Sequence, residues 1–134
     1  MANFVYEKAR QKFLEGGIAW LSQTIKVQLL TTGYTPNSAT DEFFNIIPSG
    51  ARVSTPQTLG SKTSTLGNAM GGDLAFPTVG PSGTSITGYV FYRDTGTEST
   101  SPLICYIDTA TGLPLLANGG TVNIQFTGTR IFRI

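Results

Sequence analysis

The chain has 134 residues, of which 40% are apolar and only 13% are charged, and its formal net charge is +1. This length fits one domain, residues 1–134, with a sizeable core. A balance so near neutrality lacks the positive field that nucleic acid or an anionic membrane surface requires, so we expect neither as a partner.

The start of the chain predicts a short amphipathic helix over residues 3–15. Asn3 can cap it, and Val5, Ala9 and Phe13 keep helical spacing. Gly16 and the glycine after it should end it. A helix this short needs a surface to pack on, either its own sheet or another subunit.

The next segments predict β structure. Residues 24–29 alternate, which places Ile25, Val27 and Leu29 on one face. Thr40 should cap a single helical turn over residues 41–46, ended by Pro48. Residues 48–72 are rich in Ser, Thr, Gly and Pro. We expect a long loop or arm there, with short strands at 52–54 and 62–66.

The second half carries clearer strand signals. Leu74 and Phe76 mark a strand broken by Pro77. Residues 86–92 are apolar on both faces, which predicts a central strand, and residues 103–107 predict another. The sequence between them, residues 94–100, has the composition of a hairpin loop.

A turn at residues 118–120 leads into a predicted last strand, in which alternate positions are apolar and Gly128 allows a bend. The apolar parity consists of Val122, Ile124, Phe126, Phe132 and Ile134. Several short strands separated by turns predict a mainly β fold: an antiparallel β-sandwich or barrel with a short N-terminal helix.

The residue types for catalysis are largely missing. Without histidine, neither a Ser-His-Asp nor a Cys-His arrangement can form, and Cys105 lies in an apolar run that predicts a buried residue. The Asp94-Thr95-Gly96 tripeptide matches aspartic proteases but is also ordinary turn chemistry. We therefore predict no enzymatic activity and no catalytic, cofactor-binding or metal-binding residue.

Two binding alternatives remain open on the residues. A calcium ion would need oxygen ligands such as Asp94, Glu98 and Asp108. A glycan-binding module would need exposed aromatic rings, for which the candidates are three tyrosines on or near the strands: Tyr34, Tyr89 and Tyr106.

Several segments resemble, in order, a family of small structural proteins of tailed-bacteriophage virions. Besides the N-terminal helix with its glycine stop, the matching segments are TIKVQLLTTGYTP (24–36), DEFF (41–44), IPSGARV (47–53), GYVFYRDTGT (88–97), SPLICYID (101–108) and NGG (118–120). Residues 55–85 depart most from the pattern. The resemblance implies a virion component, either a head decoration or a tail-associated protein, without catalytic residues.

These observations lead to one functional hypothesis: a capsid decoration or cement protein on the outer shell. A tail or neck component such as a tube, adaptor or fibre base is the alternative within virions. We expect the major capsid protein or other virion proteins as partners, and a homo-oligomer, with a trimer as our guess. The chain should be made in the host cytoplasm and not addressed to a membrane, since it lacks a signal core or a run of about 18 apolar residues. The resemblance implies that it is then located in the virion. The candidate docking residues are Phe4, Phe13, Trp20 and Arg52.

Overall fold

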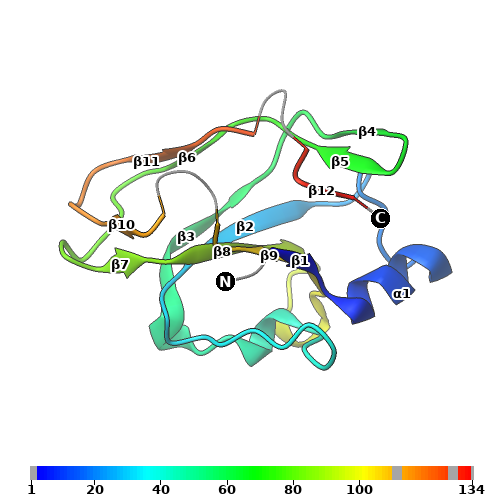
Figure 1. The fold of residues 1–134 in the computed structure, drawn as a ribbon, viewed down its shortest axis with the longest axis horizontal. Helices are drawn as coiled ribbons and strands as arrows, with labels where there is room; N and C mark the ends of the chain where they lie inside the picture. The colour runs from blue at the N-terminus through cyan, green and yellow to red at the C-terminus, as the bar shows by residue number, and fades with distance from the viewer. Residues whose placement is uncertain (1–2, 110–112, 127–129, 134) are drawn as a thin grey trace.

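The computed structural model describes residues 3–109, 113–126 and 130–133. It is mainly β, with antiparallel sheets and one short helix near the N-terminus, as predicted. Figure 1 shows strands in layers that resemble a sandwich, and the sheets do not close into a barrel. The buried apolar residues form one cluster, and its members come from both halves of the chain.

The largest layer is a five-stranded sheet in the order β1-β9-β8-β2-β3, with every neighbouring pair antiparallel. The predicted central strand is β8, which lies between β9 and β2, and the predicted loop of residues 94–100 joins β8 to β9. The strands are β1 (Phe4–Val5), β2 (Ile25–Leu30), β3 (Arg52–Thr58), β8 (Gly88–Arg93) and β9 (Leu103–Ile107).

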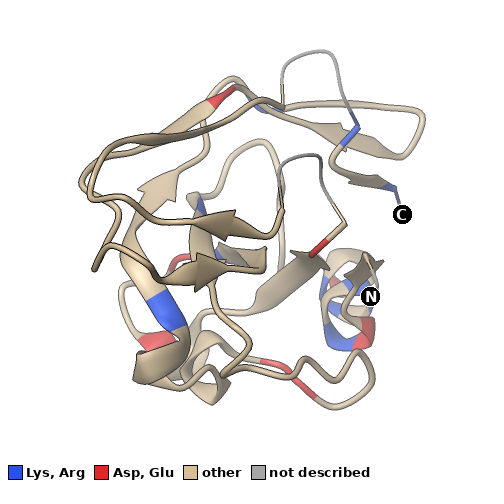
Figure 2. Cartoon of the chain, turned by 60° about the vertical axis from the view of Figure 1, so that its left-hand side comes forward, with Lys and Arg blue, Asp and Glu red and all other residues tan. Residues whose placement is uncertain are grey.

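The second layer is a bent two-stranded ribbon, here called the arched ribbon, formed by residues 74–86 and 115–124. At one end β6 (Leu74–Phe76) pairs with β11 (Val122–Ile124), and at the other β7 (Ser85–Ile86) pairs with β10 (Leu115–Leu116). Gly119 lies at the bend with a φ of 83° and donates its N–H to the Val79 carbonyl. Neither arm contains a charged residue, and Figure 2 accordingly shows few coloured residues along it.

The third layer has the order β12-β5-β4. The short strands predicted at 52–54 and 62–66 are present, the first as part of β3 and the second as β4 (Thr63–Thr65). The segment 48–72 is nevertheless paired into the sheets rather than a free arm: it forms a 3-10 turn, η2 (Ser49–Ala51), then β3, which pairs with β2, and then the hairpin of β4 and β5 (Asn68–Met70). Val53 and Leu59 are buried, so this Ser- and Thr-rich stretch is anchored by a few apolar side chains and by backbone pairing.

The N-terminal helix is shorter than predicted. Helix α1 spans Glu7–Glu15, with Tyr6 at its N-cap position, and ends at Gly16 in the left-handed conformation as expected. Residues Phe4 and Val5 pair with β9 and cannot be helical. The side chain of Asn3 accepts hydrogen bonds from the backbone N–H groups of Asp108 and Thr109 instead of capping the helix.

Two further predictions need correction. The helical turn expected over residues 41–46 is reduced to η1 (Phe44–Ile46), and Thr40 does not cap it. A similar turn, η3 (Glu98–Thr100), lies in the β8–β9 loop. The single last strand is wrong as well, because β11 pairs with β6 whereas β12 (Phe132–Arg133) pairs with β5. The expected bend at Gly128, and Ile134, lie outside the described residues.

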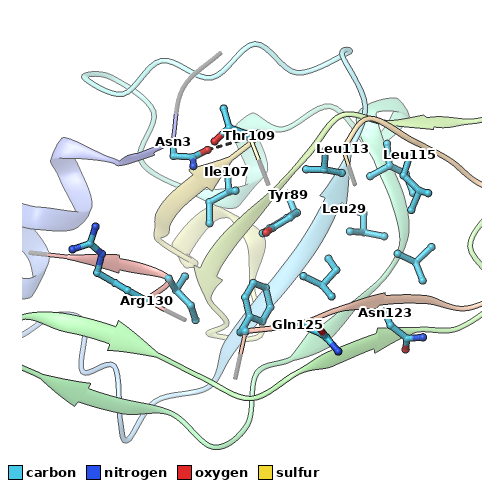
Figure 3. A pocket seen from close by; sticks show the side chains of 15 residues that line it. Asn3, Leu29, Tyr89, Ile107, Thr109, Leu113, Leu115, Asn123, Gln125 and Arg130 are labelled. Carbon is cyan, nitrogen blue, oxygen red and sulfur yellow. Dashed lines mark hydrogen bonds between the residues drawn. The ribbon is translucent and has the colours of Figure 1, made fainter. Parts of the chain in front are cut away.

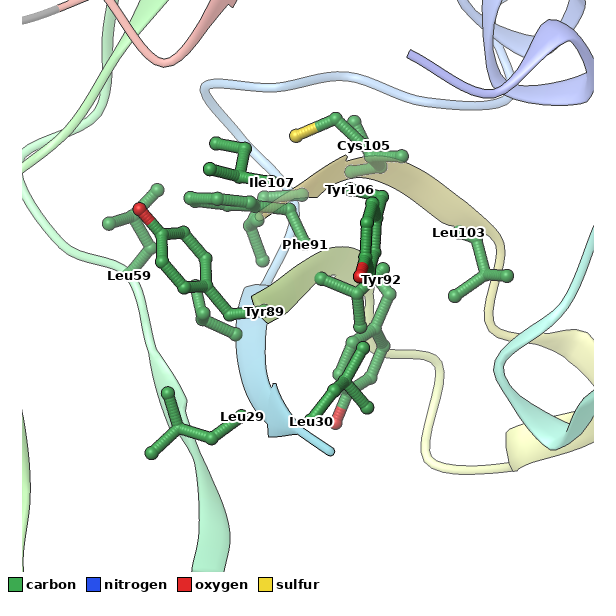
Figure 4. Close-up of a cluster of buried hydrophobic side chains, with 14 of the residues drawn as sticks. Leu29, Leu30, Leu59, Tyr89, Phe91, Tyr92, Leu103, Cys105, Tyr106 and Ile107 are labelled. Atoms are coloured by element: carbon green, nitrogen blue, oxygen red, sulfur yellow. The ribbon is translucent and has the colours of Figure 1, made fainter. Parts of the chain in front are cut away.

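The central strands of the five-stranded sheet, β2, β8 and β9, are buried on both faces. Figure 4 shows aromatic and aliphatic side chains packed around β2, β8 and β9, including the buried Cys105. Leu29 is 0% exposed, and its neighbour Gln28, on the opposite parity, is only 1% exposed. This amide fills a bulge, because Gln28 lies opposite three β3 residues, 54–56, between the pairs Val27↔Gln57 and Leu29↔Val53.

Candidate docking surfaces

The structure places the predicted docking residues in different environments. Phe4 and Phe13 are half-buried, on β1 and α1. Trp20 is only 7% exposed, its indole N–H donates to the Met70 carbonyl at 3.2 Å, and its ring meets Phe132 edge-on. Trp20 is therefore a core residue of the isolated chain, where it packs beneath β12 and β5, and it is not itself available to a partner.

Arg52 is held by internal contacts. Its guanidinium lies 4.2 Å from the centre of the Phe44 ring and forms a two-point salt bridge with the Glu98 carboxylate at 2.7 and 3.0 Å. It also donates to the carbonyls of Phe44 and Ile47. Phe44 in turn stacks on Tyr92 with a centroid distance of 4.0 Å. These bonds occupy most of the donors that a partner would use.

The residues that sequence reasoning missed are two leucines, which we name the leucine end. Leu14, near the end of α1, is 85% exposed, and Leu66, in the β4–β5 turn, is 88% exposed. Both elements lie on the right-hand side in Figures 1 and 2. The two elements are connected through β12. The ring centroids of Phe13, on α1, and Phe132, on β12, are 5.9 Å apart, and β12 pairs with β5.

Leu66 is unusual in its backbone as well as its exposure. The two-residue turn Leu66-Gly67 has positive φ at both positions, 51° and 81°, as in a type I′ hairpin. Asn, Asp and Gly adopt this conformation readily, whereas leucine pays about 1–2 kcal/mol. Gly67, directly after the segment TST (63–65), was the sequence signal for this turn.

A cavity of about 780 Å³ lies between the arched ribbon and the five-stranded sheet. Its floor includes Leu29, Tyr89 and Ile107, from β2, β8 and β9, and Asn123 and Gln125 lie along its other side (Figure 3). The remaining lining residues are mostly apolar: Asn3, Ile86, Thr109, Leu113, Leu115, Val122, Ile124, Phe126, Arg130 and Ile131. The exposed surface of the walls is about equally polar and apolar, because backbone and amide groups lie between the apolar side chains.

A second hollow, of about 500 Å³, lies beside the bulge and is polar. The Lys26 ammonium is 2.9 Å from the Asp94 carboxylate, and the Arg52–Glu98 pair also borders it. The Gly96 N–H and then Lys26 hold the pKa of Asp94 below its usual value, and the Arg52 hydrogen bonds do the same for Glu98. The cations and carboxylates here neutralise each other.

The motifs considered for chemistry have structural roles in this fold. The Asp94 side chain accepts the N–H of Gly96 at 2.9 Å, which is a local turn bond. Cys105 is fully buried, and burial raises its pKa. Asp94 and Glu98 each have a cationic partner. No three side chains of the types that hold metals gather anywhere in the described ranges.

The aromatic rings considered for sugar binding are buried. Tyr34, Tyr89 and Tyr106 are 6%, 3% and 6% exposed. Tyr34 and Tyr106 meet edge-on at 6.3 Å within the core. None of the three therefore presents the open ring face on which a sugar stacks.

No helix within the described residues is long and apolar enough to cross a membrane. Comparison with models of protein families and with curated protein sequences yields no match.

Proposed function

We propose that this chain is a structural protein of a tailed-bacteriophage virion, specifically a decoration or cement protein that binds the outer capsid shell without enzymatic activity. The observation that best supports a docking role is Leu66. It is 88% exposed and held at a φ of 51°, so the isolated chain gains nothing from a leucine there. Strained, exposed positions of this kind suggest functional constraint.

A cement protein stabilises a shell by burying surface across neighbouring capsid subunits. Many copies on a lattice can each bind modestly, because the repeated arrangement supplies avidity. In this proposal Leu14 and Leu66 enter an apolar depression on the major capsid protein or another virion protein. Phe4 and Phe13 extend the contact, and Trp20 keeps its base rigid.

The charge pattern is consistent with a protein that works within an assembly. Both arms of the arched ribbon, residues 74–86 and 115–124, lack charged side chains, and charged residues are depleted at the centre of protein interfaces. We propose that the chain also associates with itself around a closed axis, as a trimer, because cyclic symmetry matches the local axes of a shell.

Immunogold electron microscopy of intact particles tests the location, with antibody raised against this chain. We expect gold over the faces of the head. Gold confined to the neck or tail would replace the decoration role by that of a tube, adaptor or fibre base. Absence of label, with the epitope accessible, would refute the virion hypothesis.

Variant proteins added to particles stripped of this chain test the leucine end. Leu66→Asn should leave the fold at least as stable, since Asn suits the turn, but reduce occupancy of the particle about tenfold. Leu14→Gln should act in the same direction. Ile46→Gln is the control, because Ile46 is also exposed, at 52%, but lies in η1. If Leu66→Asn and Leu14→Gln occupy the particle as fully as the control Ile46→Gln, the leucine end is excluded as the docking site.

A further inference from the structure

The cavity under the arched ribbon runs along the edge of a strand. Five consecutive residues, 122–126, line it. Neighbouring side chains of a strand point to opposite faces, so a cavity facing only one side of β11 would contact alternate residues. Contact with both parities means that the cavity borders the edge of β11. In Figure 3 β11, which carries Asn123, and Gln125 just after it lie between the cavity and β6.

That edge has no partner strand in the described part of the chain. β11 pairs with β6 alone, and β10 with β7 alone, so the second layer of the sandwich has two strands over a sheet of five. The unpaired side of a strand presents backbone N–H and C=O groups that readily accept another strand. At the β10 end, Leu115 and Leu116 are 36% and 67% exposed. The cavity therefore occupies the position of a missing strand.

The charge of the lining limits what can fill this position. Arg130 is the only charged residue among those that line the cavity, and it lies at one end, opposite Leu113 and Leu115 (Figure 3). An occupant with an acidic group at that end would be complementary to it, whereas a basic one would be repelled.

We propose that an extended, mainly apolar segment of a neighbouring virion protein inserts into this cavity as an added strand beside β11, with an acidic residue facing Arg130. Backbone hydrogen bonds to the β11 edge supply affinity, and alternate side chains enter the space above Tyr89 and Ile107. A volume of about 780 Å³ is within the range of about 300–1,000 Å³ typical of ligand sites. The source of the segment rests on the proposed virion location, but the strand position does not.

Photo-crosslinking in assembled particles tests the insertion. p-Benzoylphenylalanine replaces Asn123, which is exposed at the cavity edge, and in a matched control it replaces Thr55, which is exposed on β3 and does not line the cavity. We expect position 123 alone to crosslink, to one extended segment of another virion protein. Hydrogen exchange of residues 122–126 should slow in the particle.

Charge reversal tests the role of Arg130. Arg130→Glu should lower the crosslink yield at position 123 about tenfold. Arg133→Glu should leave it unchanged, because Arg133 is exposed on the nearby β12 but does not line the cavity.

The outcomes separate this inference from the proposed function. If the chain is present in particles but position 123 stays unlinked and β11 exchanges as fast as in the free protein, the insertion is refuted while the virion role stands. A crosslink to a second copy of this chain would refute the heterologous partner. If the chain is absent from particles, the proposed function fails, and the added-strand proposal fails with it for a virion partner.

Discussion

The hydroxyl groups of Tyr6 and Tyr34 are 2.7 Å apart in the core. Tyr34 donates in turn to the Asp41 carboxylate at 2.7 Å, so Tyr6 is the donor in the buried bond. This chain of hydrogen bonds ties the residue before α1 to the loop that follows β2, and it connects segments 28 residues apart in the sequence.

The two tyrosines should respond differently to loss of the hydroxyl. Tyr6→Phe removes one hydrogen bond and leaves Tyr34 bonded to Asp41, so we expect a loss of about 1 kcal/mol. Tyr34→Phe leaves the Tyr6 hydroxyl, at 0% exposure, without its partner and should cost about 1–3 kcal/mol. Urea unfolding measures both, and a larger effect for Tyr6→Phe would contradict this order.

The buried tyrosines also predict alkaline unfolding. Burial raises the pKa of Tyr89 to about 12 and raises those of Tyr6, Tyr34 and Tyr92 further. In the unfolded chain a tyrosine ionises near pH 10. Between about pH 10 and 12 the unfolded state therefore binds fewer protons, and the free energy of unfolding falls as the pH rises.

Ultraviolet absorbance of tyrosinate and circular dichroism, recorded together across this range, test that prediction. Buried tyrosines should ionise only as the fold is lost, so the two signals should change together. Full tyrosine ionisation near pH 10 with an intact fold would show that these hydroxyls are accessible.

The chain between β11 and β12 offers a matched pair of substitutions. Phe126 is 4% exposed and contacts Phe91 at 5.3 Å, whereas Gln125 is exposed. Phe126→Ala should reduce the free energy of unfolding by about 3–5 kcal/mol, and Gln125→Ala should leave it nearly unchanged. Thermal or urea unfolding measures both, and equally harmless substitutions would place Phe126 outside the core.

Gln28 should stabilise the bulge in β3. Its side-chain amide donates to the carbonyls of Val53 and Ser54 at 2.8 and 3.1 Å. Gln28→Leu keeps the volume similar but leaves these carbonyls unpaired, so we expect a loss of about 1–3 kcal/mol and faster hydrogen exchange in β3. Gln57→Leu is the control, since its amide bonds only to the exposed Thr55 carbonyl. Equal effects would argue against the bulge contact.

The Arg52 contacts should depend more on the shape of the guanidinium than on its charge. Glu98 has a side chain that is 56% exposed, so Glu98→Gln should cost below about 1 kcal/mol after screening by solvent. Arg52→Lys keeps the charge but loses the stack on Phe44 and the bonds to two carbonyls, and should cost about 1–3 kcal/mol. Chemical denaturation compares them, and a larger loss for Glu98→Gln would reverse this interpretation.

The features that depend on neighbouring residues could be predicted from the amino-acid sequence alone. Gly16 ends the helix because its backbone can adopt positive φ, and the apolar stretch containing Val90 becomes the central strand because both its faces need burial. The buried Cys105 and the turn at Asp94 follow from the same local reasoning. These elements were predicted correctly because the physical requirement and the residues that meet it are adjacent.

The pairing of distant segments could not be predicted in this way and follows from the packing of the folded chain. Phe4 joins β9, and the stretch around Val53 joins β2, because each finds a partner for its backbone across the sheet. Phe126 and Phe132 have the same parity in the sequence and lie in the same core. Phe126, however, follows β11, which pairs with β6, whereas Phe132 is in β12, which pairs with β5. The cavity beside β11 arises in the same way. It depends on packing between residues far apart in the chain, and periodicity within one segment carries no information about its partner.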